Sequence, residues 1–126
     1  MSKKGLLIIV HGSRDPKWCQ PFEDFVQNTS TRLKTDKVRL CYMELVSPTL
    51  ETVVGDWVKE GLTHIQVIPF FMASGGHVDN NIPKIIREAQ AKYPHIQIDQ
   101  LPPIGEHSAV KESMINVVAT YLDYGG

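Results

Sequence analysis

The sequence predicts an α/β fold: a single flavodoxin-like domain with a four-stranded parallel sheet and helices on both faces. Short apolar runs alternate with segments of helical periodicity along all 126 residues, and no linker or repeat interrupts the alternation. The length suits one domain. Hydrophobic residues make up 42% of the chain and charged residues 21%, which is ordinary for a globular protein.

Four short segments have the composition of sheet strands. Residues 5–10 contain no charged side chain, as expected of a parallel strand covered on both faces. Residues 38–43 and 64–70 form the second and third strands. Residues 96–101 are more polar, so the fourth strand is expected near an edge. By analogy with flavodoxin-like sheets, the expected strand order is 2-1-3-4.

Each predicted strand is followed by a segment in which apolar residues recur at helical spacing. The second of these helices is expected to begin with Ser47 as its N-cap and Pro48 at the first helical position. Asp79 or Asn80 is expected to cap the third helix. The last helix is expected to have an apolar face, made of Val110, Met114, Val117, Val118 and Tyr121.

Charge and cysteine content exclude several classes of protein. Lys and Arg number 13 against 14 Asp and Glu, a balance that does not favour a nucleic-acid or membrane partner. The apolar run at residues 5–10 is too short for a signal peptide or a membrane span, so a cytoplasmic location is expected. Cys19 and Cys41 form no CxxC motif, and two cysteines cannot hold an iron–sulfur cluster alone. Cys41 is expected to be a buried free thiol.

Histidine or glutamate follows the carboxyl end of every predicted strand, the edge at which open parallel sheets bind their ligands. His11, Glu44 and His77 follow the first three strands, and His107 follows the fourth. Strands one and three are expected neighbours, so His11 and His77 are predicted to lie on the same side of one crevice. Two imidazoles and one carboxylate suit a divalent ion such as Co²⁺, Fe²⁺, Ni²⁺ or Zn²⁺, with coordination positions left open.

Structural alternatives to these roles stay open. Each histidine could merely cap a strand end or sit in an exposed turn, Glu44 could point to solvent, and His107 falls at a helix start. Glycines in both loops favour a ligand site, because they permit a sharp turn or a close approach of the backbone. The candidate substrate-binding residues of the two loops are Gly12, Ser13, Arg14, Ser74, Gly75 and Gly76.

Other functional motifs do not match. The chain has no GxxxxGK[ST], GxGxxG or GxSxG, which argues against phosphate-loop, dinucleotide-binding and α/β-hydrolase functions. Val10 stands where phosphoglycerate-mutase-like enzymes place an arginine. His64 and His95 precede strands three and four, on the opposite rim, and are interpreted as surface histidines.

Four blocks of sequence, in order along nearly the whole chain, together resemble the pattern of a known family. They are an apolar strand running into His-Gly-Ser-Arg-Asp-Pro at residues 11–16, Glu44 with the Ser-Pro-Thr-Leu that follows, residues 67–83 around Gly-Gly-His, and Pro-Ile-Gly at residues 103–105. This pattern resembles the sirohydrochlorin cobaltochelatases and ferrochelatases, the class II chelatases.

The resemblance implies a chelatase-like enzyme that inserts Co²⁺, or else Fe²⁺ or Ni²⁺, into sirohydrochlorin during cobalamin or sirohaem biosynthesis. It implies that His11 and His77 bind the metal and accept pyrrole protons, with Glu44 near that metal. The metal is a substrate, and no permanently bound cofactor is expected. Larger members contain two such domains, so residues 1–126 correspond to a half-size form that is expected to pair as a homodimer. The alternative is a metallochaperone or tetrapyrrole carrier that uses the same cleft without turnover.

Overall fold

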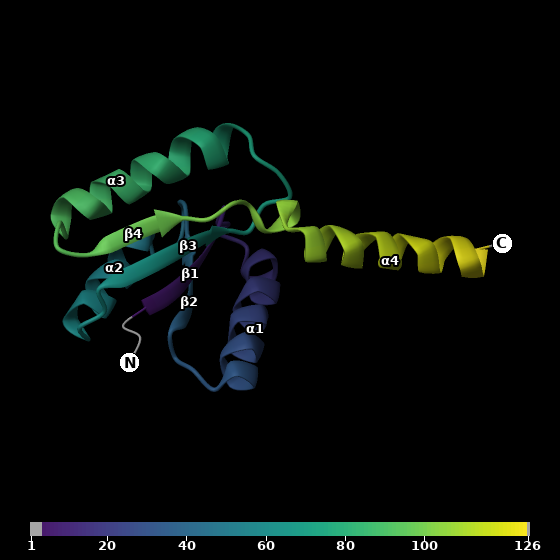
Figure 1. Ribbon diagram of the computed structural model, residues 1–126, viewed down its shortest axis with the longest axis horizontal. Helices are drawn as coiled ribbons and strands as arrows, with labels where there is room; N and C mark the ends of the chain where they lie inside the picture. The colour runs from purple at the N-terminus through teal and green to yellow at the C-terminus, as the bar shows by residue number, and fades with distance from the viewer. Residues whose placement is uncertain (1–3, 126) are drawn as a thin grey trace.

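A computed structural model describes residues 4–125, apart from the side chains of residues 77 and 123–125. Its described strands form one parallel sheet in the order β2-β1-β3-β4 (Figure 1). The strands are β1 (Lys4–Val10), β2 (Val38–Tyr42), β3 (His64–Pro69) and β4 (Gln97–Gln100). The fold class and the strand order predicted from the sequence are therefore confirmed.

Helices cover both faces of the sheet, as expected. The helical elements are α1 (Pro16–Leu33), α2 (Leu50–Lys59), the π-helical turn η1 (His77–Asn81), α3 (Ile82–Lys92), the 3-10 turn η2 (Ile104–Glu106) and α4 (Ser108–Gly125). Helices α2 and α3 pack on one face, and α1 packs on the other face over β1 and β2 (Figure 1).

Strand β1 lies at the centre of the core and explains the uncharged run in the sequence. Leu7 and Ile9 point to the face covered by α2 and α3, whereas Ile8 and Val10 point to the face covered by α1. All four side chains are buried. Both faces of β1 are thus removed from water, and a charged side chain at any of these positions would be desolvated without a partner.

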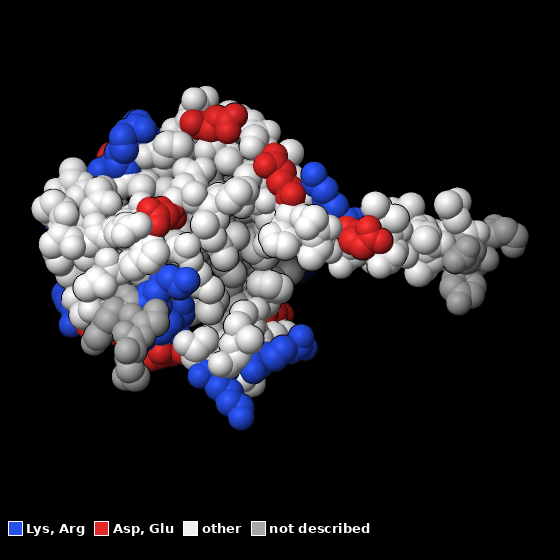
Figure 2. Space-filling model, in the orientation of Figure 1, with Lys and Arg blue, Asp and Glu red and all other residues white. Residues whose placement is uncertain are grey.

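Helix α4 covers neither face of the sheet. It projects from the carboxyl-terminal edge as an arm (Figure 1), and most of its apolar side chains are exposed. The space-filling view shows the same arm with few charged atoms along its length (Figure 2). None of the described helices, α4 included, is long and apolar enough to cross a membrane.

The predicted start of α2 is wrong. Thr49 is the N-cap, and its hydroxyl accepts a hydrogen bond from the Thr52 amide at 3.3 Å. Ser47 and Pro48 do not begin the helix, because the Pro48 carbonyl accepts the Tyr42 amide at 2.9 Å. That hydrogen bond holds the segment beside the end of β2, so the helix starts only after it.

The predicted caps of α3 are also wrong. Asp79 and Asn80 already lie inside η1, where the Asp79 amide donates to the Gly75 carbonyl at 2.7 Å. The residue at the N-cap position of α3 is Asn81, which makes no side-chain capping bond. The turn η1 runs directly into α3, so His77 is the first residue of one helical unit.

Candidate active site

The backbones of His11 and Glu44 lie side by side at the carboxyl edge of the sheet. Strand β1 pairs with β2 up to the register Val10–Tyr42. The ladder continues past this pair, since the Met43 amide donates to the Val10 carbonyl at 2.9 Å and the Glu44 amide to the His11 carbonyl at 3.2 Å. The order of the strands therefore places both residues at one point, as the sequence predicted.

The side chains of His11 and Glu44 also meet. His11 Nε2 lies 3.2 Å from Glu44 Oε1, and His11 Nδ1 lies 3.3 Å from the Gly12 carbonyl oxygen. The imidazole is 36% exposed and the carboxylate 56% exposed, so a ligand can reach both groups. A carboxylate beside an imidazole can balance the charge of a bound cation or of the protonated ring.

Gly12 makes this contact possible. Its φ is +107°, a conformation that residues with a side chain rarely adopt. A Cβ atom at this position would lie 2.1 Å from the Glu44 carbonyl oxygen. The absence of a side chain at Gly12 thus allows the two chain segments to touch, which confirms the predicted sharp turn after His11.

His77 is placed by its backbone alone, because its side chain lies outside the described residues. Its segment is anchored on both sides. The next residue, Val78, is buried in the core, and the Val78 carbonyl accepts the Gln100 side-chain amide at 3.2 Å. The Asp79–Gly75 hydrogen bond closes the turn around His77. Gln100 is a supporting residue in the segment 96–101, for which the sequence predicted only a more polar strand near an edge.

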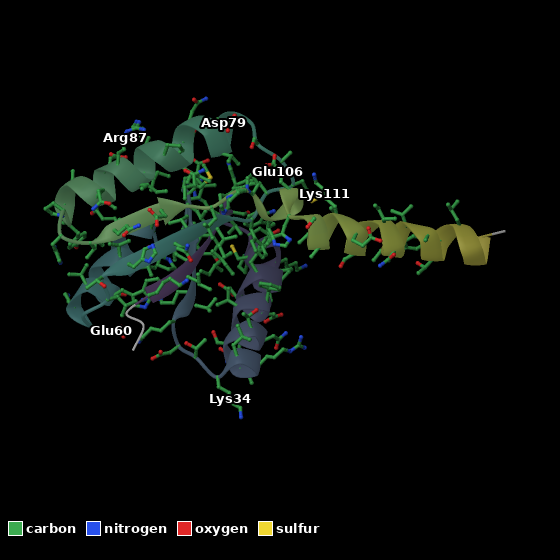
Figure 3. The ribbon with its side chains drawn as sticks, in the orientation of Figure 1. Lys34, Glu60, Asp79, Arg87, Glu106 and Lys111 are labelled. Atoms are coloured by element: carbon green, nitrogen blue, oxygen red, sulfur yellow. The ribbon has the colours of Figure 1, made fainter. Side chains whose placement is uncertain are left out.

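A second supporting residue, Glu106, was missed. Its Oε2 accepts hydrogen bonds from the Ser74 amide at 3.0 Å and from the Ser74 hydroxyl at 3.2 Å. Figure 3 shows Glu106 at the base of α4, in η2. The Gly105 amide donates to the Phe71 carbonyl at 3.0 Å, and a Cβ on Gly105 would lie 2.3 Å from the Met72 carbonyl oxygen. Turn η2 therefore holds the chain that leads to His77.

The remaining predicted substrate-binding residues differ in their surroundings. A Cβ on Gly75 or Gly76 would meet no described atom within 4 Å, so packing within the described chain does not require glycine at either position. The Ser13 hydroxyl accepts the Asp15 amide at 3.0 Å, within its own loop. Arg14 is exposed and lines a hollow of about 240 Å³ together with Ser13 and Ser47.

The surroundings of the three remaining histidines are those of structural or surface residues. His107 Nδ1 accepts the Ala109 amide at 3.1 Å and so caps the start of α4. His64 lies at the opposite rim, with Nε2 2.7 Å from Asp99 Oδ2, a hydrogen bond that lowers the pKa of Asp99. His95 is exposed in the turn before β4. The interpretation of His64 and His95 as residues of the opposite rim agrees with these positions.

No group of three metal-binding side chains is preformed among the described residues, a set that excludes the His77 side chain. The carboxyl edge of the sheet, where His11 and Glu44 meet, is also open to solvent. A surface hollow of about 910 Å³ lies elsewhere, between α1 and β2, and is lined by neither His11 nor Glu44. It is an open surface groove, and we assign it no role because the chemical groups predicted for the site lie elsewhere.

Fold and site together define a chelatase-like α/β domain with a histidine–carboxylate pair at its ligand-binding edge. The chain belongs to the CbiX family, whose family model matches residues 5–121. It is 32% identical over 103 residues to the sirohydrochlorin ferrochelatase of Bacillus subtilis (strain 168), covering 82% of this chain and 40% of that protein.

Two solved structures are similar over most of the chain. A CbiX protein from Marinobacter aquaeolei VT8 has 28% sequence identity and a TM-score of 0.84, with 97% of each chain covered. The sirohydrochlorin chelatase SirB from Bacillus subtilis subspecies spizizenii, in complex with cobalt, has 31% identity and a TM-score of 0.75. That match covers 93% of this chain and 51% of SirB. The chain spans about two fifths of the length of the first curated relatives it matches.

Proposed function

We propose that the chain is a sirohydrochlorin chelatase lobe that inserts a divalent metal ion into the tetrapyrrole. The observation that carries this proposal is the contact of His11 with Glu44 at the carboxyl edge of a CbiX-family sheet. Relatives named for both cobalt and iron insertion support Co²⁺ and Fe²⁺ as metal substrates. Ni²⁺ remains a further candidate on the basis of its ligand preferences.

Metal insertion exchanges two pyrrole N–H protons for one M²⁺ ion, so the site must deliver a cation and accept two protons. An imidazole with a pKa near ~6.5 can do either task near neutral pH, depending on its protonation state. In the proposed mechanism His11 and His77 bind the incoming ion and accept the pyrrole protons. Glu44, beside His11, balances the charge of the ion while it loses water.

The macrocycle is proposed to lie over the two loops that carry the histidines. Sirohydrochlorin bears many carboxylates, and the exposed Arg14 at the mouth of the first loop can pair with one of them. Gly75 and Gly76 leave space beside the second loop for the ring to approach the backbone. The neighbouring Ser74 is already hydrogen-bonded to Glu106, so its proposed part is to shape that loop.

A second lobe is proposed to complete the site, as a homodimer of residues 1–126. Ligand pockets bury ~70–90% of a drug-sized ligand, and a tetrapyrrole is larger still. The open edge of one domain does not enclose such a molecule. Relatives of about twice this length or more support a two-lobed arrangement. The cytoplasmic location expected from the sequence remains a prediction.

Multiple-turnover metal insertion tests the proposed function. Purified protein is incubated anaerobically with excess sirohydrochlorin and Co²⁺, Fe²⁺ or Ni²⁺, and the absorption change of the tetrapyrrole is followed. Many turnovers per chain are expected, and the ratio of the rates ranks the three metals. Binding of one equivalent without turnover would instead identify a metallochaperone or carrier and would contradict the proposal.

A further inference from the structure

Leu45 has an unusual backbone conformation directly beside the candidate site. Its φ is +76°, in the left-handed region, where a bulky side chain is strained against its own backbone. Within the described residues one other non-glycine residue, Lys34, has a positive φ, of +54°. Lys34 is the C-cap of α1, and helices commonly end in this conformation. Leu45 lies in the bend between β2 and α2, so the end of a helix does not explain its conformation.

The neighbours of Leu45 explain how the conformation is imposed. On one side the Glu44 amide donates to the His11 carbonyl at 3.2 Å. On the other side Val46 is partly buried and packs against the part of the core that lies under α1. Leu45 must therefore connect a residue held at the edge of the sheet to a residue turned into the core. Its own side chain is left 50% exposed.

Neither the backbone nor the solvent favours leucine at this position. A single exposed leucine is ordinary on a protein surface. Here, however, asparagine or glycine would adopt the left-handed backbone with less strain, and a polar side chain would suit the exposure better. Strained residues beside a ligand site indicate a functional constraint. An exposed apolar side chain at such a place is suited to contact an apolar part of the ligand.

Met72 shows a similar combination of a fixed backbone and an exposed side chain. It follows β3, and it is 64% exposed. Turn η2 packs directly against its backbone, since a Cβ on Gly105 would lie 2.4 Å from the Met72 Cα. Strand β1 lies between β2 and β3, so Leu45 and Met72 follow the strands on either side of the one that leads to His11. Exposed apolar residues therefore flank the candidate site along the edge of the sheet.

The order of residues after β2 matches the layout of a tetrapyrrole. Such a molecule takes the metal at its centre, carries its carboxylates at the rim and has an apolar conjugated ring between them. Glu44 belongs to the predicted metal site. Ser47 lines the hollow that it shares with Arg14, the residue proposed to pair with a carboxylate. Leu45 lies between these two parts of the chain, where the ring itself would pass.

We propose that Leu45 is a substrate-binding residue whose side chain packs against the apolar face of the tetrapyrrole ring, and that Met72 makes the same kind of contact beyond β3. The inference rests on the proposed function, because it takes sirohydrochlorin as the ligand. It adds a contribution to binding that comes from burial of apolar surface. Pairing of carboxylates weakens as the salt concentration rises, whereas burial of apolar surface does not, so the two contributions can be measured separately.

Two substitutions to asparagine test the assignment of Leu45. Leu45→Asn tolerates the left-handed backbone but removes the apolar contact, so its melting temperature should be no lower than that of wild type. Its Kd for metal-free sirohydrochlorin, measured by fluorescence titration, is expected to rise roughly tenfold. Lys34→Asn is the matched control, because it makes the same change at the other positive φ, at the far end of α1 (Figure 3). Its Kd should stay within about twofold of wild type.

Three further variants separate the apolar contact from other causes. Leu45→Met keeps an apolar side chain and is expected to bind like wild type. Met72→Gln keeps the length of the side chain but makes its end polar, and should raise the Kd several-fold. The losses in Leu45→Asn and Met72→Gln should be equal at low and high NaCl concentration, whereas the loss in Arg14→Gln should shrink as salt is added.

The outcomes distinguish this inference from the proposed function. Unchanged affinity of Leu45→Asn, in a protein whose wild type inserts metal, would overturn the inference and leave the proposed function intact. A loss of affinity in Lys34→Asn as large as that in Leu45→Asn would also overturn it, because the effect would then follow from the backbone and not from the contact. A wild type that does not bind sirohydrochlorin would overturn both.

Discussion

Two histidine–carboxylate pairs lie at opposite ends of the same sheet. His11 and Glu44 meet at the carboxyl edge at 3.2 Å, whereas His64 and Asp99 meet at the amino edge at 2.7 Å. The amino-edge pair is the shorter, and it lowers the pKa of Asp99. If contact distance identified a functional site, the amino-edge pair would be the better candidate.

The surroundings of the two pairs lead to the opposite conclusion. His64 and Asp99 belong to neighbouring strands and join across one face of the sheet as diagonal cross-strand neighbours, since His64 is in register with Gln97. His11 and Glu44 lie beyond their strands, where Gly12 must adopt a positive φ for them to meet. Residues at the strand termini that need unusual backbone geometry indicate a ligand site more strongly than a short contact does.

The largest expected effect comes from removing an edge histidine. His11→Ala and His77→Ala are each expected to lower the turnover number for Co²⁺ insertion by at least ~100-fold, since each removes a metal ligand and a proton acceptor. His64→Ala is the matched control and is expected to stay within about twofold of wild type. Steady-state kinetics with circular dichroism of each variant make the comparison. Equal damage from His64→Ala, with the fold intact, would mean that the site is assigned to the wrong edge.

Gly12→Ala is expected to be the next most damaging change. The new Cβ would collide with the Glu44 carbonyl, and the positive φ would be strained, which together should cost about 1–3 kcal/mol of unfolding free energy. Turnover should fall about tenfold as His11 and Glu44 separate. Urea denaturation measures the stability. Gly76→Ala, at an open position, serves as the control, and equal stability of the two variants would refute the packing argument.

Much of the fold follows from the sequence, because a parallel strand buried on both faces must be apolar throughout. Residues 5–10 predicted β1 in this way, and the strand order was confirmed. The position of α4 could not be predicted. Periodicity from Val110 to Tyr121 indicates that one side of the helix needs a partner, but it does not say whether that partner is the sheet of the same chain. The N-cap at Thr49 was missed because the Pro48 carbonyl is held by the distant Tyr42 amide.

One contact of the candidate site could be predicted from the sequence. Neighbouring strands predict that His11 and Glu44 share an edge, and they do. The support from Glu106 to Ser74 could not be foreseen, since it joins residues 32 positions apart in the chain. The roles of His77 and the substrate-binding loops remain predictions.

Glu44→Gln should have a smaller effect than the histidine changes. Glutamine keeps the size and the hydrogen-bonding oxygen of the side chain but removes the charge beside His11, so turnover should fall about tenfold. Tetrapyrrole affinity should change less, because the lost charge faces the metal. Fluorescence titration with sirohydrochlorin separates binding from turnover. Unchanged kinetics with all three metals would make Glu44 a structural residue.

Asp99→Asn should have the smallest effect, confined to stability. The pKa of Asp99 is lowered by its hydrogen bond with His64, so the ionised carboxylate stabilises the folded state above the ordinary Asp pKa of about 3.9. That contribution is lost as the pH falls through the lowered pKa. At pH 6 the melting temperature of Asp99→Asn should therefore lie below that of wild type, but by less than the melting temperature of Gly12→Ala does. The difference in melting temperature between wild type and Asp99→Asn should shrink at pH 3. A constant difference across this range would exclude the ionised pair as its cause.

A Co²⁺ titration followed by visible absorption tests most directly whether the carboxyl edge is the metal-binding edge. The ligand-field bands of Co²⁺ report coordination by protein side chains, and the tetrapyrrole is absent from the measurement. Wild type and His64→Ala are expected to give the same bands with similar affinity, whereas His11→Ala should lose them or bind at least tenfold more weakly. Loss of the bands in His64→Ala, with His11→Ala unchanged, would contradict the account.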